Sequence, residues 1–524
     1  FAINLTNQGA NATSINKAGT GQWNLTNNGN NYTGLTQISG GTLNVSSLSD
    51  YGVASAIGAR TLAQEVSAGN GIGLWFGPAT STGTLQYTGA TAQSTNRQMR
   101  VGTGGAAFDA SGSTPSATMN FTFSNPNVNF WDTGGNRTIT LTGTNTGDNT
   151  FALNIQDHAA TGVSSVVKNG PGTWVLTNAH NADTPGSTGG VYSGFSGAVT
   201  INDGMLKTSV AGSLGVATSP IVFAGGAGTG KLGVSGGINI PKPLTVNGRS
   251  TASPVVENLG GANTLSGAVT LAGGGSAYAF TSTGTTAGDL LTISGPVSGS
   301  GLSTTPSLTL NGAGNGVIAS AIGDLGVTLG LVKSGAGTWT LTGSNGYTGG
   351  TVVSQGTLLA NNTSGSATGT GNVTVLSGAT FGGTGAISSL VTTSAGSFLS
   401  PGASIESLNV GSASGAGTLL IEYDAAAGSP IDVLSVVNNL DISAMKVDFN
   451  QIGTPLAASA YPFASYGTLT GTSFATVTDL PAGYAIDYHY LSGNTIALVP
   501  VPEPGTLGLA AGAGLLFLRR RRNP

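Results

Sequence analysis

A ten-residue pattern, K-x-G-x-G-x-W-x-L-T, occurs three times in this chain and limits the folds that it can adopt. The copies begin at Lys17, Lys168 and Lys333. Each predicts short strands joined by glycine turns, with tryptophan and leucine on one strand face because side chains alternate along a strand. The predicted inward-facing pairs are Trp23 and Leu25, Trp174 and Leu176, and Trp339 and Leu341. Internal repetition of this kind is typical of architectures in which similar units stack on one another.

Each copy is followed by an aromatic residue in a turn and then by a further strand. The first copy continues to Tyr32-Thr33-Gly34 and the third to Tyr347-Thr348-Gly349. In the second copy a longer insertion intervenes, and we take Tyr192-Ser193-Gly194 as the counterpart. Core packing is the favoured role of the three tryptophans over stacking on carbohydrate, because each is in phase with its leucine.

The composition favours a β-rich fold. Only 7% of the 524 residues are charged, against a typical quarter, and 88 are glycine. Apolar residues reach 39%, too many for a disordered chain. Runs of three to five alternating residues, separated by glycine-rich turns, recur over some 400 residues. A single sandwich or barrel closes after far fewer strands, so we predict an all-β, right-handed parallel β-helix with about 20 to 25 residues per coil.

Charge and cysteine content exclude several classes of function. The chain has no cysteine, which excludes disulfides, thiolate metal sites and a cysteine nucleophile. The net charge is −4, and 4 of the 16 basic residues form one run at the C-terminus. The sparsely charged, acidic remainder is unsuited to binding nucleic acid, which requires clustered lysine and arginine. No cofactor or metal is expected.

Three segments are expected. Residues 1–416 form the β-solenoid, with the repeats at about 17–45, 168–206 and 333–359. Residues 417–499, richer in acidic and aromatic residues, form a C-terminal β cap that covers the open end of the solenoid. Residues 500–524 form a separate tail. Because the chain begins at Phe1 without a leader pattern, we expect that a signal peptide has been removed or that the sequence is truncated.

The tail has a distinctive order of residues. Pro502, Glu503 and Pro504 precede an apolar run, Gly505–Leu518, which is followed by Arg519, Arg520, Arg521 and Arg522. A helix of this length spans about 21 Å, short of the ~30 Å hydrocarbon core of a bilayer. With arginines on the cytoplasmic side, it is expected to act as a transient membrane stop. A plain C-terminal anchor is the less favoured interpretation.

Two resemblances follow from these motifs. The three copies, covering about a fifth of the chain, resemble the autotransporter-associated β-strand repeat, and the segment Gly335–Leu358 matches its pattern nearly throughout. That resemblance implies a right-handed β-helix of the passenger type. The tail resembles a PEP-CTERM sorting signal. It implies recognition by an exosortase-type enzyme, cleavage near Pro502-Glu503-Pro504, and delivery to the surface or extracellular matrix of a Gram-negative-type bacterium.

Catalytic patterns are weak. The 20 carboxylates are scattered, and His158, His180 and His489 are isolated. A surface turn is the favoured interpretation of Asp157-His158, ahead of a catalytic pair. Two solvated charges are the favoured interpretation of Arg97 and Arg100, ahead of a ligand site.

We therefore expect a non-enzymatic, secreted structural or adhesive solenoid. Its expected partners are exopolysaccharide, a biofilm matrix or a neighbouring cell surface. The alternative is a carbohydrate-active β-helix enzyme, a lyase or hydrolase, because stacking could bring distant aspartates together.

Overall fold

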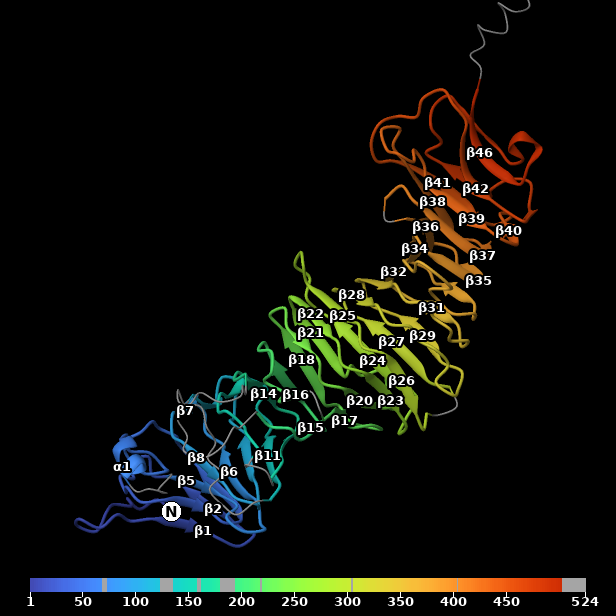
Figure 1. Cartoon of the computed structure of the whole chain (residues 1–524). Coiled ribbons are helices and arrows are strands. Elements are labelled where there is room, and N and C mark those ends of the chain that lie inside the picture. The colour runs from blue at the N-terminus through green and yellow to red at the C-terminus, as the bar shows by residue number, and fades with distance from the viewer. Residues whose placement is uncertain are drawn as a thin grey trace, which may run out of the picture. The chain divides into compact units, whose positions relative to one another are not determined.

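The computed structural model describes residues 1–67, 73–122, 135–157, 162–179, 194–216, 219–302, 305–402 and 404–501 of the chain. It divides into two compact units. Unit 1 comprises Phe1–Ser320 with Leu325–Thr328, and unit 2 comprises Ala321–Asp324 with Leu329–Pro524. Each unit is a parallel β-helix, built from short strands that pair with the equivalent strands of the next coil (Figure 1).

Unit 1 contains four parallel sheets. Its strands, in hydrogen-bonded order within each sheet, are as follows. The first sheet holds β1 (Ile15–Lys17), β3 (Thr36–Ile38), β5 (Leu74–Phe76) and β8 (Met99–Val101). The second holds β2 (Gln22–Leu25), β4 (Gly41–Val45), β6 (Gly83–Tyr87), β9 (Ala106–Ala110), β11 (Arg137–Thr142), β13 (Ser164–Lys168), β15 (Val199–Ile201), β17 (Ile221–Phe223), β20 (Leu244–Asn247), β23 (Val269–Ala272) and β26 (Val297–Ser300). The third holds β7 (Gln93–Thr95), β10 (Met119–Phe121), β12 (Asn149–Phe151), β14 (Thr173–Leu176), β16 (Met205–Thr208), β18 (Lys231–Ser235), β21 (Val256–Gly260), β24 (Ala277–Ser282) and β27 (Ser307–Asn311). The fourth holds β19 (Asn239–Ile240), β22 (Ala262–Leu265), β25 (Leu290–Ile293) and β28 (Asn315–Ile318).

One short helix, α1 (Leu62–Ser67), lies beside the first coils (Figure 1), and the sequence analysis did not predict it.

The core of unit 1 lies inside the coils, because alternate residues of each strand point inward. Partners on neighbouring coils are in register, so like side chains stack. Five aromatic side chains, from strands of three different sheets, form a cluster within this core: Phe76, Phe108, Phe121, Phe151 and Trp174. Neighbouring ring centroids lie 4.9–6.5 Å apart, within the range at which aromatic pairs attract.

Unit 2 repeats this construction with two long ladders, which are parallel except at the C-terminal end of the second. One contains β30 (Thr338–Leu341), β32 (Gly356–Ala360), β34 (Ala379–Gly383), β36 (Phe398–Pro401), β38 (Thr418–Tyr423), β41 (Lys446–Gln451) and β44 (Thr476–Thr478). The other contains β29 (Gly330–Lys333), β31 (Thr351–Val353), β33 (Val373–Val375), β35 (Ala386–Thr393), β37 (Ser407–Gly415), β39 (Val433–Val436), β40 (Asn439–Asp441), β42 (Tyr461–Ser465), β43 (Thr468–Thr470), β45 (Tyr484–Asp487) and β46 (Thr495–Pro500). A 3-10 turn, η1 (Tyr490–Ser492), lies between β45 and β46.

The parallel β-helix and the coil length match the expectations from the sequence. Paired residues Ile221 and Leu244 of unit 1 are 23 residues apart, and Thr351 and Val373 of unit 2 are 22 residues apart.

The boundary expected at residue 417 does not coincide with a change in strand direction. Parallel pairing continues through β38, β41 and β44. Antiparallel pairing joins β46 to β42 and to β45, so the cap-like part of the described chain begins near Tyr461. The rise in acidic and aromatic residues that suggested the boundary includes buried side chains, such as Tyr423 and Asp432, and composition does not report strand direction.

Candidate functional site

The lysine of each repeat is buried and binds backbone carbonyls. Lys17, Lys168 and Lys333 are each 0% exposed. Each lysine ends one strand, and the repeat tryptophan lies on the next strand around the coil. Two of the three acceptors belong to the turn that follows the lysine, and the third lies on the next coil. The acceptor oxygens are those of Ala18, Gly19 and Gly40 for Lys17 (2.9, 2.9 and 3.0 Å), Asn169, Gly170 and Asp203 for Lys168 (2.8, 2.6 and 2.9 Å), and Ser334, Gly335 and Gln355 for Lys333 (3.1, 2.7 and 2.9 Å).

We call the three carbonyl oxygens around each lysine its cage. An ammonium group has three N–H donors, and each cage accepts hydrogen bonds from all three. Burial lowers the pKa of Lys168 and of Lys333 to about 8, and it also lowers the pKa of Lys17. The three carbonyl oxygens favour the charged form, and at neutral pH Lys168 and Lys333 carry their protons. The cage therefore ties two coils together. Sequence analysis assigned no role to these lysines, although their fixed place in all three copies was a usable signal.

A glycine of each repeat permits the close approach of two coils. Gly41, Gly204 and Gly356 have φ angles of +64°, +64° and +66°. A Cβ atom on Gly356 would lie 2.4 Å from the carbonyl oxygen of Gly335, and one on Gly204 would lie 2.4 Å from that of Gly172. The position therefore requires glycine both for its backbone conformation and for space.

The aromatic residue after each repeat packs in the core. The hydroxyl of Tyr32 lies 2.7 Å from the Thr36 hydroxyl, and Tyr347 makes the same contact with Thr351 at 2.7 Å. Burial raises the pKa of Tyr32 to about 12.

In the second copy the counterpart of these tyrosines is Phe195, not the predicted Tyr192, which lies outside the described residues. Gly215 contacts Phe195 as Gly58 contacts Tyr32. Four residues after Phe195 stands Val199, so both hydrogen-bonding partners have been replaced by apolar residues. Such a paired replacement leaves no buried polar group unsatisfied. Because the second copy contains an insertion, residue spacing in the sequence could not identify Phe195 as the counterpart of these tyrosines.

Five of the six predicted core residues of the repeats are buried. Leu25 is 1% exposed, and Trp174, Leu176, Trp339 and Leu341 are each 0% exposed.

Trp23 is the exception, since 38% of it is exposed. It lies on β2, the first strand of its sheet, so one side of its ring has no neighbouring coil. The ring of Phe1 packs against it edge-on at 5.4 Å, and Nζ of Lys17 lies 5.9 Å from its centroid.

The interpretation of Arg97 and Arg100 as solvated charges was wrong for Arg97, which is 2% exposed. Its guanidinium donates hydrogen bonds to the carbonyl oxygens of Ile57 at 2.8 Å and of Gly58 at 2.7 Å. Arg97 therefore stabilises the loop that precedes α1, as the lysines stabilise the turns of the repeats. The guanidinium of Arg100 stacks on Trp75 at 4.3 Å.

Asp157 accepts hydrogen bonds from the backbone N–H groups of Ser164 at 2.8 Å and Ser196 at 3.0 Å. In the third copy Asp324 likewise accepts one from the N–H group of Thr348 at 2.9 Å. These aspartates order turns, which agrees with the structural interpretation of Asp157; His158 and His180 lie outside the described residues. His489 contacts the Tyr466 hydroxyl through Nδ1 at 2.8 Å.

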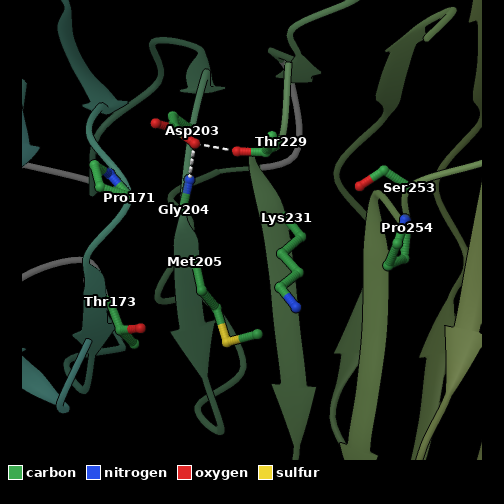
Figure 2. A pocket seen from close by; sticks show the side chains of 9 residues that line it. All are labelled: Pro171, Thr173, Asp203, Gly204, Met205, Thr229, Lys231, Ser253 and Pro254. Carbon is green, nitrogen blue, oxygen red and sulfur yellow. Dashed lines mark hydrogen bonds between the residues drawn. The ribbon is translucent and has the colours of Figure 1, made fainter. Parts of the chain in front are cut away.

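A groove on the side of unit 1 is lined mainly by polar side chains and prolines (Figure 2). We call it the lateral groove. It encloses about 360 Å³ and crosses the turns that precede β14, β16, β18 and β21, which are neighbours in the third sheet. Its lining residues are Pro171, Thr173, Asp203, Gly204, Met205, Thr229, Lys231, Ser253 and Pro254.

Asp203 is the sole carboxylate that lines the lateral groove. One of its oxygens accepts hydrogen bonds from the Gly204 N–H at 2.8 Å and from the Thr229 hydroxyl, while the other points away from both (Figure 2). The ammonium group of Lys231 is paired with Glu257 at 2.8 Å.

Two buried cations hold the walls of the lateral groove. Lys168 binds the carbonyl oxygen of Asp203, as described above. Arg249, 1% exposed, donates hydrogen bonds to the carbonyl oxygens of Ser253 at 3.3 Å and Pro254 at 2.9 Å, and also to that of Gly230. The turns on both sides of the groove are thus fixed by charged hydrogen bonds, which are stronger than neutral ones.

In unit 2 a buried carboxylate binds backbone N–H groups. Asp432 is 0% exposed, and its two oxygens accept the backbone N–H groups of Glu406 and Glu422, each at 2.9 Å. Burial and the nearby carboxylates of Glu422 and Glu406 raise its pKa to about 7. Within the described ranges, no three or more histidine or acidic side chains gather in a way that could hold a metal ion.

Comparison with known families identifies both predicted motifs. A family model described as "Passenger-associated-transport-repeat" matches residues 15–45, 166–207 and 331–360. A second, described as "PEP-CTERM protein-sorting motif", matches residues 500–522. The chain carries passenger-type repeats and a PEP-CTERM motif. Residues Pro502, Glu503, Pro504 and Arg519–Arg522, on which the second match depends, lie outside the described residues, as does the expected C-terminal helix. Among the residues that the structure does describe, no helix is long and apolar enough to cross a membrane.

Two adhesins are similar to this chain. The "Adhesin BmaC autotransporter" of Brucella suis biovar 1 (strain 1330) is 40% identical over 223 residues, which make up 42% of this chain and 6% of the adhesin. The crystal structure of the Haemophilus influenzae Hap adhesin aligns with 93% of this chain and 57% of its own, at 12% identity and a TM-score of 0.36. The chain therefore spans less than two thirds of either relative. The β-helix fold is established here by the strand pairing itself.

Proposed function

We propose that this protein is a secreted or cell-surface adhesive solenoid without enzymatic activity. The observation that carries the proposal is the presence in one chain of a parallel β-helix built on passenger-type repeats and of a protein-sorting motif. The likeness to an autotransporter adhesin supports the adhesive part of the proposal.

The side-chain chemistry supports a binding role rather than catalysis. Glycoside hydrolysis requires a pair of carboxylates on either side of the bond that is cleaved. Asp203 is the single carboxylate among the residues lining the lateral groove. Asp157 and Asp432, which are partly or fully buried, bind backbone N–H groups and so stabilise the fold.

The proposed route to the surface uses the tail. An exosortase-type enzyme recognises Pro502-Glu503-Pro504, while residues 505–518 make transient contact with the membrane and the four arginines stay on its cytoplasmic side. Cleavage then releases the solenoid to the surface, where it contacts exopolysaccharide of a biofilm matrix or neighbouring cells. Mass spectrometry of the exported protein should find its C-terminus near Pro504, and a terminus that retains Arg519–Arg522 would contradict this route.

Attachment of cells tests the function. A strain lacking the protein should attach less to a glass surface and to other cells than the parent strain, and the full chain should restore attachment. A matched strain carrying a chain with the Pro502-Glu503-Pro504 motif changed to Ala-Ala-Ala should not restore it, because its product is not displayed. Equal attachment by all strains would contradict the adhesive role.

A further inference from the structure

We propose that the lateral groove is a binding site for a neutral, hydroxyl-rich saccharide, with Asp203 as the main acceptor of ligand hydroxyl groups. This inference rests on the proposed surface function and names the ligand class for one part of the surface. At about 360 Å³, the groove falls within the range typical of small-molecule sites, which is about 300–1,000 Å³.

The lateral groove offers hydrogen-bonding groups that the chain does not itself use. The second oxygen of Asp203, the hydroxyl of Thr173 and the hydroxyl of Ser253 have no hydrogen-bond partner among the described residues. A carboxylate oxygen accepts hydrogen bonds, and each hydroxyl both donates and accepts them. Pro171 and Pro254 lie at the two ends of the groove, with Asp203 between them (Figure 2), and supply apolar surface for the C–H faces of sugar rings.

The charges in the groove select against other ligand classes. Lys231, the cation among the residues that line the groove, is already paired with Glu257, and the buried Lys168 and Arg249 bind backbone carbonyl groups, so the groove offers an anionic ligand no unpaired cation. One carboxylate is too few to hold a divalent cation, which requires several oxygen ligands. The polar lining also disfavours a purely apolar ligand, since its binding would leave these groups without partners.

The walls of the groove are fixed before any ligand binds. Lys168 holds the turn at Asp203, and Arg249 holds the turn at Ser253 and Pro254. Glycine also permits close approach of neighbouring coils beside the groove, since a Cβ atom on Gly230 would lie 2.7 Å from the carbonyl oxygen of Ile201. A site fixed in this way loses little conformational entropy on binding, so its few hydrogen bonds contribute more to affinity.

Two groove-lining residues, Asp203 and Pro171, are particular to the second repeat, whereas the lysine cage is common to all three. Asp203 occupies the position of Gly40 in the first copy and Gln355 in the third. Pro171 occupies the position of Thr20 and Ala336. The other two copies therefore build the same turn around a buried lysine without a carboxylate, and they provide an internal control.

The test measures binding of the full chain to cellohexaose, maltohexaose and mannohexaose by calorimetry, with polygalacturonate as an anionic comparison. We expect the wild-type chain to bind at least one neutral hexaose, and to do so equally in 0.1 M and 1 M NaCl, because the contacts involve uncharged hydroxyl groups. Asp203→Asn, which keeps the shape of the side chain, should weaken binding about tenfold, since hydrogen bonds to a charged acceptor are stronger than those to a neutral one. Ser253→Ala should weaken it about threefold.

Gln355→Ala is the matched control, because it changes the equivalent turn of the third repeat and should leave affinity unchanged. Equal melting temperatures of the variants exclude misfolding as the cause. Failure of the wild-type chain to bind any neutral hexaose, equal binding by Asp203→Asn, or salt-sensitive binding of polygalacturonate alone would each overturn the inference. If cells carrying the Asp203→Asn chain attach normally, the groove inference fails and the adhesive function stands. If the wild-type chain is absent from the cell surface, only the proposed function is contradicted.

Discussion

Replacing one caged lysine tests the interaction that every repeat shares. In Lys333→Met the side chain keeps most of its length, while the ammonium group is lost and the carbonyl groups of Ser334, Gly335 and Gln355 lose their donor. The lysine side chain is fully buried while its three hydrogen bonds are part-buried, so water can replace the lysine only in part. The variant should therefore loosen the third repeat.

The expected size of the effect follows from two opposing contributions. Three carbonyl groups that lose their donor in this partly buried site cost about 1–3 kcal/mol each, or about 6 kcal/mol together. Removing the buried charge returns about 3 kcal/mol, because burial lowers the pKa of Lys333 from 10.5 to about 8 and each pKa unit corresponds to about 1.4 kcal/mol. The net loss is about 3 kcal/mol, equivalent to about a hundredfold change in an equilibrium constant.

Amide hydrogen exchange is the suitable assay, because coils of a solenoid can open locally. Protection of the amides in β30 and β32 should fall about a hundredfold in Lys333→Met. Lys446→Met, which changes an exposed lysine of the same unit, should alter protection little. Unchanged or increased protection in Lys333→Met would refute the reasoning, since it would mean that the cage adds nothing to the stability of the repeat.

Three further predictions concern unit 2 and the repeats. Gly356→Ala should destabilise its coil by at least about 2 kcal/mol in urea unfolding, because the φ of Gly356 is +66° and the new Cβ atom would clash. The control is Gly346→Ala, whose Cβ atom would meet no atom within 4 Å and which should change stability by less than about 0.5 kcal/mol. Trp339→Ala should cost about 3–5 kcal/mol and Trp23→Ala only about 1–2 kcal/mol, and equal losses would contradict the difference in burial. The pKa of Asp432 is raised from 3.8 to about 7 in the folded state, so the folded state favours its neutral form. The resulting stability is full below about pH 4 and is lost as the pH rises through 7. Exchange protection of β39 and β40 should therefore fall over that range in the wild type and stay level in Asp432→Asn.

The repeat motif predicted the fold well because its residue types serve the same physical purpose in every copy. Alternation placed Leu25, Leu176 and Leu341 in the core, and glycine positions marked the turns. The motif could not predict that Trp23 would be partly exposed, because exposure depends on whether a neighbouring coil covers the strand. The sequence pattern also did not predict that Phe195 and Val199 replace the hydrogen-bonded tyrosine and threonine of the other copies. Such a paired substitution preserves packing in the core while it removes the residue types by which the pattern is recognised.

Buried cations were the main feature that the sequence analysis missed. Lysine and arginine are expected at the surface, and this expectation led to the interpretation of Arg97 as a solvated charge. In this chain Lys168, Arg97 and Arg249 instead bind backbone carbonyl groups, which leave no trace in the sequence because every residue carries one. The lateral groove was beyond prediction for the same reason: Asp203 and Ser253 are 50 residues apart, and the coils bring them to one side of the solenoid.

Surface display on intact cells tests the central claim most directly. Living cells that express the protein are treated briefly with protease, and the released peptides are identified by mass spectrometry. The account predicts that peptides from residues 1–501 are released from intact cells, at levels similar to those from lysed cells. Release of these peptides only after lysis would contradict the claim that the solenoid is displayed at the cell surface.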